Sequence, residues 1–257
     1  MADDTEPAQV TQRLDEWAHI DEALLRYHVA QWAEPKRSTQ CFAEFIRPRL
    51  FDAKTVIDLG CGAGAATSYI ASRNEQVSFV GIDYSAQMIA IAQKASQQAA
   101  HRNVSFETGD WFDLRERADV DGVMSLQTLS WLPEFERPLK VIFDRLRPRW
   151  LAVSSLFYDG DISCTIEVNE HVRERKTFYN VYSLPALDRF ARRSGYHVAV
   201  AEPFRIDVDI PQPPDRDLMG TYTVRLPSAD PANATRLQIS GPLLMNWQFV
   251  VLERDSH

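Results

Sequence analysis

The chain has 257 residues, of which 45% are hydrophobic and 25% are charged, and its 36 acidic and 28 basic side chains give a formal net charge of −8. This is the composition of an ordinary globular protein, so intrinsically disordered, collagen-like and low-complexity classes are excluded. The acidic balance argues against nucleic-acid binding, and no apolar run reaches the ~20 residues that a membrane span needs, so we expect neither partner.

The N-terminus and the cysteines bear on the cellular compartment. The opening sequence MADDTEP lacks the basic and apolar regions of a signal peptide. Cys41, Cys61 and Cys164 stand too far apart for a disulfide framework or a metal-ligand spacing. We therefore expect a cytoplasmic protein with no metal site.

The first part of the chain has a helical pattern. Over residues 11–50, apolar residues recur at three- and four-residue steps, which is typical of amphipathic helices. Pro35 separates two such helices, and Ser38 or Thr39 can cap the second. We interpret residues 1–50 as an N-terminal helical lid segment.

The middle of the chain alternates between strands and helices. Short apolar, β-branched runs predict strands at Thr55–Leu59, Val77–Ile82, Val104–Glu107, Gly122–Leu126 and Leu151–Leu156. Helical patterns between them lie at Ala65–Ser72, Ala86–Gln98 and Glu134–Leu146. This order predicts an α/β fold with a parallel, doubly wound sheet that is covered by helices on both faces.

The last third of the chain is less regular. A helix is predicted at Leu184–Ser194, and strands at His197–Ala201 and Asn246–Leu252. Thr221–Leu226 and Arg236–Ile239 flank a turn-rich stretch, which predicts a β-hairpin. We therefore predict a single domain over residues 51–257, with residues 204–245 as an insertion before the last strand.

A glycine-rich turn follows the first predicted strand. In Gly60-Cys61-Gly62-Ala63-Gly64, three of the chain's 10 glycines fall together, between a strand and a helix. Glycines let the backbone turn sharply and let a ligand approach closely, and the helix N-terminus supplies unpaired N–H groups. In a doubly wound sheet this point lies at the carboxyl ends of the strands, where ligands bind.

Carboxylates follow the next two predicted strands. Asp83 ends one of them, where a carboxylate can accept hydrogen bonds from ribose hydroxyls. Asp110 follows the other, where it can accept from an adenine amine, and Trp111 can cover a ring face. Together with the glycine turn, these residues predict a cofactor that contains adenosine.

The residue before the glycines distinguishes two such cofactors. NAD(P) binds glycine turns of this spacing and would make the protein an oxidoreductase. Asp58, however, would repel a pyrophosphate and attract an α-amino group, which S-adenosylmethionine carries. The charge pattern therefore favours S-adenosylmethionine.

These segments resemble the motifs of class I S-adenosylmethionine-dependent methyltransferases. The similar segments are DLGCGAG (58–64, first motif), GIDYS (81–85, ribose motif), TGD (108–110, adenine motif) and DGVMSL (121–126, the fourth strand, whose end borders the methionine). The resemblance covers residues 55–156 and extends less fully to 182–203 and 246–254. It implies a Rossmann-like sheet of seven strands, the last one antiparallel, and a methyltransferase of the small-molecule type.

The resemblance also implies which residues hold the cofactor. Asp58 would meet the methionine amine, Asp83 the ribose hydroxyls and Asp110 the adenine amine. The other residues expected to contact S-adenosylmethionine are Gly60, Gly62, Tyr84, Met88, Trp111 and Leu126.

The acceptor site is predicted from position alone. Nucleic-acid and protein-amide methylases often carry an Asn/Asp-Pro-Pro-Tyr/Phe motif after the fourth strand. This motif is absent here, where the chain reads SLQTLSWL. We therefore expect methyl transfer to O or N of a small polar metabolite, such as a sugar, an amine or an amino-acid-like molecule. The candidate general base is His171. The candidate pocket residues are Tyr27, Trp32, Trp131, Tyr179 and Asn180. A noncatalytic S-adenosylmethionine sensor or scaffold stays open, as does a monomer or a homodimer.

Overall fold

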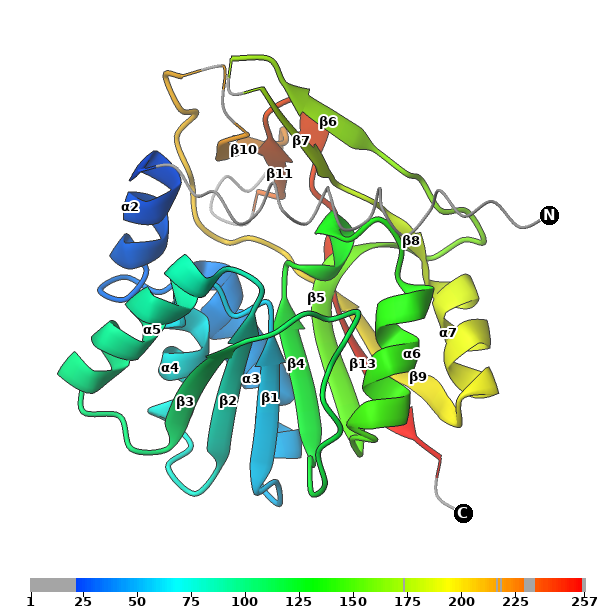
Figure 1. Cartoon of the computed structure of the whole chain (residues 1–257). Coiled ribbons are helices and arrows are strands. Elements are labelled where there is room, and N and C mark those ends of the chain that lie inside the picture. The colour runs from blue at the N-terminus through cyan, green and yellow to red at the C-terminus, as the bar shows by residue number, and fades with distance from the viewer. Residues whose placement is uncertain (1–21, 173, 216, 218, 229–233, 256–257) are drawn as a thin grey trace.

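The computed structural model describes residues 22–172, 174–215, 217, 219–228 and 234–255. Its main sheet has the strand order β3-β2-β1-β4-β5-β13-β9 (Figure 1). These strands are β1 (Thr55–Leu59), β2 (Ser78–Asp83), β3 (Val104–Thr108), β4 (Gly122–Leu126), β5 (Trp150–Tyr158), β9 (Tyr196–Pro203) and β13 (Trp247–Arg254). Strands β1 to β5 are parallel, and β13 is antiparallel to both β5 and β9. This confirms the predicted Rossmann-like sheet with an antiparallel last strand.

A short strand extends this sheet beyond the predicted seven. β8 (Tyr182–Ser183) pairs with the end of β5 in parallel, which makes the sheet 8-stranded. A strand of two residues has no periodic pattern, so the sequence did not indicate it.

Helices cover both faces of the sheet, because successive strand residues point to opposite sides. The helices are α3 (Arg37–Leu50), α4 (Ala65–Ala71), α5 (Ala86–Gln98), α6 (Glu136–Arg145) and α7 (Leu184–Arg193). Ile57 packs in one buried cluster with Leu139 of α6 and Leu187 of α7. Its neighbour Val56 packs in another, with Phe42 of α3 and Ile70 of α4. Because β1 is packed on both sides by these clusters, its position in the sheet and the position of its carboxyl end are held in place.

Pro35 lies between two N-terminal helices, as predicted. The first described helix, α2 (Glu22–Ala30), is followed by a turn, and α3 begins at Arg37. The predicted cap is wrong: Lys36 is the N-cap residue, without a side-chain hydrogen bond, and Ser38 and Thr39 lie in the first turn of the helix. The apolar positions before residue 22 lie outside the described residues.

Two small sheets lie beyond the carboxyl ends of the main strands (Figure 1). β10 (Thr221–Arg225) and β11 (Arg236–Ser240) form the predicted hairpin, to which β12 (Leu243–Leu244) is added. The antiparallel pair β6 (Glu167–Glu170) and β7 (Arg175–Phe178) was not predicted. Its mostly polar sequence has no apolar run of the kind that marks a buried strand.

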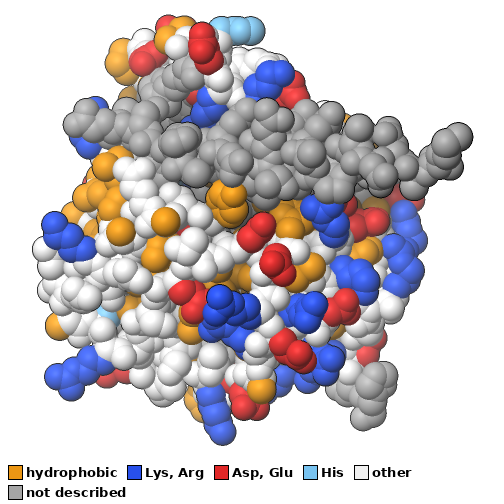
Figure 2. Space-filling model, in the orientation of Figure 1, with side chains coloured by type: hydrophobic (Ala, Val, Ile, Leu, Met, Phe, Trp, Pro, Cys, Tyr) orange, Lys and Arg blue, Asp and Glu red, His pale blue; other side chains and the backbone are white. Residues whose placement is uncertain are grey.

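The surface in Figure 2 mixes acidic and basic side chains. Ion pairs between solvent-accessible side chains lie along α6 (Lys140 with Asp144) and along α7 (Arg192 with Asp188). In the part of the chain that the structure describes, no helix combines the length and the apolar character required to cross a bilayer.

Candidate functional site

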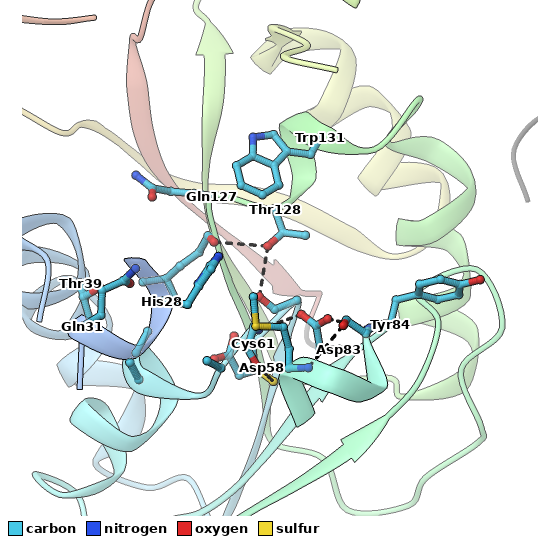
Figure 3. A pocket seen from close by; sticks show the side chains of 18 of the residues that line it. His28, Gln31, Thr39, Asp58, Cys61, Asp83, Tyr84, Gln127, Thr128 and Trp131 are labelled. Atoms are coloured by element: carbon cyan, nitrogen blue, oxygen red, sulfur yellow. Dashed lines mark hydrogen bonds between the residues drawn. The ribbon is translucent and has the colours of Figure 1, made fainter. Parts of the chain in front are cut away.

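A cavity lies at the carboxyl ends of β1, β2 and β4, around the glycine turn (Figure 3). All nine residues that were predicted to contact the cofactor line it: Asp58, Gly60, Gly62, Asp83, Tyr84, Met88, Asp110, Trp111 and Leu126. They come from separate strand ends, and the parallel sheet brings them to one edge.

The glycine turn needs glycine for both conformation and space. Gly60 and Gly62 have φ angles of +72° and +54°, in the left-handed region that favours glycine. A Cβ atom on Gly60 would stand 2.4 Å from Oγ1 of Thr128. The backbone N–H of Gly62 donates a 2.8 Å hydrogen bond to Oδ2 of Asp83, which joins the turn to the end of β2.

Asp58 is a buried carboxylate that is only partly satisfied. It is 1% exposed, and its Oδ2 accepts a hydrogen bond of 2.6 Å from Oγ1 of Thr67. Its Oδ1 has no hydrogen-bond partner among the described residues. Burial raises the pKa of this carboxyl to about 7; the Thr67 bond lowers it, and the charge of Asp83 raises it further. A bound cation would satisfy Oδ1 and stabilise the ionised form.

Asp83 and Asp110 are held by backbone amides. Oδ1 of Asp83 accepts from the N–H of Ser85 at 2.9 Å, and Oδ1 of Asp110 accepts from the N–H of Phe112 at 2.9 Å. Burial raises the pKa of Asp83, whereas the two amides that donate to it lower that pKa. Carboxylates fixed in this way keep further lone pairs for ligand hydroxyl or amine donors.

A second group of lining residues was not predicted. Lys36, which precedes α3, lines the cavity, as do His28 from α2 and Gln31 from the turn that follows it (Figure 3 shows His28 and Gln31). Burial and the positive charge of Lys36 lower the pKa of His28 to about 4, so its imidazole is neutral near pH 7. The three-residue spacing of His28 and Gln31 is the one signal that could have indicated a shared face.

The segment that follows α2 is joined to the glycine turn by a hydrogen bond. Nε1 of Trp32 donates to the carbonyl oxygen of Ala63 at 2.8 Å. Trp32 was predicted to line the acceptor pocket, and the structure instead makes it an anchor for the segment that follows α2.

The predicted acceptor residues mostly lie elsewhere. Trp131 lines the cavity, and the ring of Tyr179 packs against it with centroids 6.0 Å apart. Tyr27 is 50% exposed and contacts the His28 ring with its edge. Asn180 is fully buried, and it accepts from the N–H of Ile166 and donates to backbone oxygens. The structure therefore brings only Trp131 of this set to the cavity.

His171 is also away from the cavity. It lies exposed in the turn between β6 and β7 and is not among the lining residues. The structure thus does not bring this predicted base to the cavity, because His171 lies in a hairpin that the sequence did not indicate.

Comparisons with known proteins place this geometry in a family. A family model described as a methyltransferase domain matches residues 50–201, more than half of the chain. Trans-aconitate 2-methyltransferase of Mycobacterium tuberculosis (strain ATCC 25177 / H37Ra) is 37% identical over 102 residues, which are 39% of this chain and 36% of that protein. The Deinococcus radiodurans protein of the same name is 40% identical over 93 residues, 36% of this chain and 34% of its own length. The matched part thus spans about a third of these relatives.

Solved structures share the fold at low identity. A SAM-dependent methyltransferase from Aquifex aeolicus has a TM-score of 0.54 and 15% identity, with 93% of this chain and 100% of that chain covered. Magnesium protoporphyrin IX methyltransferase from Synechocystis PCC 6803 with bound SAH has a TM-score of 0.53 and 14% identity, with 97% of each chain covered. Such likeness supports the architecture and carries nothing about the substrate.

Proposed function

The chain belongs to the class I S-adenosylmethionine-dependent methyltransferases, and from this premise we propose that it methylates an oxygen of a small carboxylic acid. The cofactor of this family supplies a methyl group on a positively charged sulfur, which leaves with the electron pair of the carbon–sulfur bond. The residues of the chain then have to bind the cofactor and the acceptor, orient them toward each other and exclude water from the site.

The cavity fits this cofactor through its carboxylates. In our proposal, the unsatisfied Oδ1 of Asp58 receives the α-ammonium group, Asp83 the ribose hydroxyls and Asp110 the adenine amine. In the same proposal, Tyr84, Met88 and Trp111, which all line the cavity, would flank the adenine, and Leu126 and the glycine turn would lie against the rest of the molecule. A dinucleotide fits less well, since its diphosphate would meet the buried Asp58.

The distribution of charge in the cavity carries the acceptor assignment. Among the residues that the structure describes, the acidic residues that line the cavity are the three that we assign to the cofactor. The remaining lining includes one cationic residue, Lys36, together with the neutral His28 and Gln127. This remaining lining favours an anion or a neutral group over a protonated amine.

A carboxylate acceptor also suits the absence of His171 from the cavity. Its oxygen attacks the methyl carbon with a lone pair that is already free, so no proton has to be removed, whereas a hydroxyl acceptor needs a base. The names of the relatives point to the same class, because trans-aconitate is a small acid.

The test is turnover with a panel of acceptors. The protein is incubated with S-adenosylmethionine and trans-aconitate, citrate, a primary amine or a sugar, and S-adenosylhomocysteine release is measured together with the product's mass. We expect a base-labile methyl ester from an acid only. Methylation of the amine or the sugar instead would contradict the acid assignment, and cofactor binding with no turnover would favour the noncatalytic sensor.

A further inference from the structure

The His28 side chain occupies a defined place beside the glycine turn. It projects from α2 into the cavity (Figure 3). A Cβ atom on Gly62 would lie 3.5 Å from Nδ1 of His28, which is ordinary contact distance, so the ring lies directly over this glycine. Gly62 in turn donates to Asp83. The imidazole therefore covers the loop on which we place the methionine and ribose.

The His28 ring packs against the neighbouring aromatic ring of Tyr27. The Tyr27 ring meets it edge-on, with centroids 5.5 Å apart and an interplanar angle of 76°. The ammonium group of Lys36 lies 4.8 Å from the centroid of the Tyr27 ring, which steadies that ring in turn. The helix is anchored by the bond from Trp32 to Ala63. A side chain held this firmly is suited to orient a ligand.

Neither ring nitrogen of His28 has a hydrogen-bond partner among the residues that the structure describes. A half-buried imidazole next to a cavity, with both nitrogens unused, is a ready donor and acceptor for a ligand. The charged group that acts on the ring is Lys36, the N-cap residue of α3, and the nearest carboxylate partner of the glycine turn, Asp83, is bonded to Gly62. Neither forms a hydrogen bond with the ring.

We propose that His28 contacts the methyl acceptor and orients it by donating an N–H hydrogen bond to its carboxylate. The inference rests on the proposed function and adds a substrate-contacting residue to it. His28 removes no proton in this scheme, because the attacking oxygen carries none. Lys36 also lines the cavity, and its positive charge attracts the same anion in this scheme.

The test compares three variants with the full-length protein. His28→Phe removes the donor, His28→Gln keeps an N–H group, and Val29→Ala changes an exposed residue of the same helix as the control. With trans-aconitate as acceptor, we expect His28→Phe to lower kcat/KM roughly 10- to 100-fold, mainly through KM, as expected for loss of a hydrogen bond to a charged group. His28→Gln should restore most of this loss, and Val29→Ala should behave as the wild type.

Two binding measurements separate this role from a structural one. Calorimetric affinity for S-adenosylhomocysteine should fall much less in His28→Phe than kcat/KM for trans-aconitate does. In the S-adenosylhomocysteine complex of the wild type, trans-aconitate should raise the pKa of the His28 imidazole above about 4. This pKa is measured by NMR, and the His28 signal is identified by its absence from the spectrum of His28→Gln. An equal loss of affinity for S-adenosylhomocysteine, or an imidazole pKa that does not respond to the acid, would overturn the proposal.

Failure of the acid assignment gives a different result. If the wild type methylates only the amine or the sugar, the proposed substrate class is wrong. The same variants are then measured with that acceptor, and a wild-type rate for His28→Phe rejects the role of His28 in orienting the acceptor. A wild type that binds S-adenosylhomocysteine and methylates nothing in the panel rejects both proposals.

Discussion

Oγ1 of Thr67 donates a 2.6 Å hydrogen bond to Oδ2 of Asp58, and this bond links the start of α4 to the end of β1. It is the one hydrogen bond to the Asp58 carboxylate from the described residues, because the other oxygen has no partner. Thr67 therefore stabilises the ionised carboxylate that we assign to the ammonium group of the cofactor.

Thr67→Val should weaken cofactor binding. Without the hydroxyl, the ionised form of Asp58 loses a hydrogen bond to a charged group, so we expect about a tenfold weaker affinity for S-adenosylhomocysteine. Thr67→Ser keeps the hydroxyl and is the matched control. Isothermal titration calorimetry near pH 7 provides the measurement, and equal affinities for Thr67→Val and the wild type would refute the role of this bond.

The stability of the ligand-free protein should depend on pH through Asp58. Its pKa is raised from 3.8 to about 7 in the folded chain, chiefly by burial. The folded chain then retains a proton that the unfolded chain has released, so this contribution to stability is full below 3.8 and is lost as the pH rises through about 7. Asp58→Asn does not titrate. The melting temperature of the wild type relative to Asp58→Asn should therefore fall as the pH rises across this range, and a constant difference would contradict the assignment.

Asp83→Ala should reduce cofactor affinity at least about tenfold, because it removes a charged acceptor for the ribose and the partner of the Gly62 amide. Glu75→Ala, at an exposed carboxylate, is the control. Calorimetry with S-adenosylhomocysteine and with NADH distinguishes the cofactor classes. Unchanged affinity in Asp83→Ala, or tight binding of NADH to the wild type, would count against the site as described.

Gly60→Ala should lower the free energy of unfolding more than the same substitution at Gly195. Gly60 and Gly195 both have positive φ, +72° and +75°, so alanine at either position costs about 1–2 kcal/mol in backbone strain. Only at Gly60 would the new Cβ also collide with Thr128; nothing lies within 4 Å at Gly195. Chemical denaturation should show the larger loss for Gly60→Ala. Equal losses would mean that Thr128 gives way without cost.

The sequence alone determined the architecture of the sheet edge. Strand and helix periods are local, so the alternation from Thr55 to Leu156 indicated a parallel sheet. The parallel sheet in turn implied that Asp58, Asp83 and Asp110 meet at one edge. The cavity then contains every residue that this reasoning named for the cofactor.

Only the tertiary structure decided which other residues line the cavity with these carboxylates. His28 and Lys36 line the cavity in a segment that is held there by the hydrogen bond from Trp32 to Ala63 of the glycine turn. This bond joins distant parts of the chain, so no local sequence pattern predicts it. His171 is carried outward by the β6–β7 hairpin, whose polar strands have no apolar signal. Local periodicity predicts elements, whereas the placement of a segment outside the sheet depends on long-range packing and hydrogen bonds.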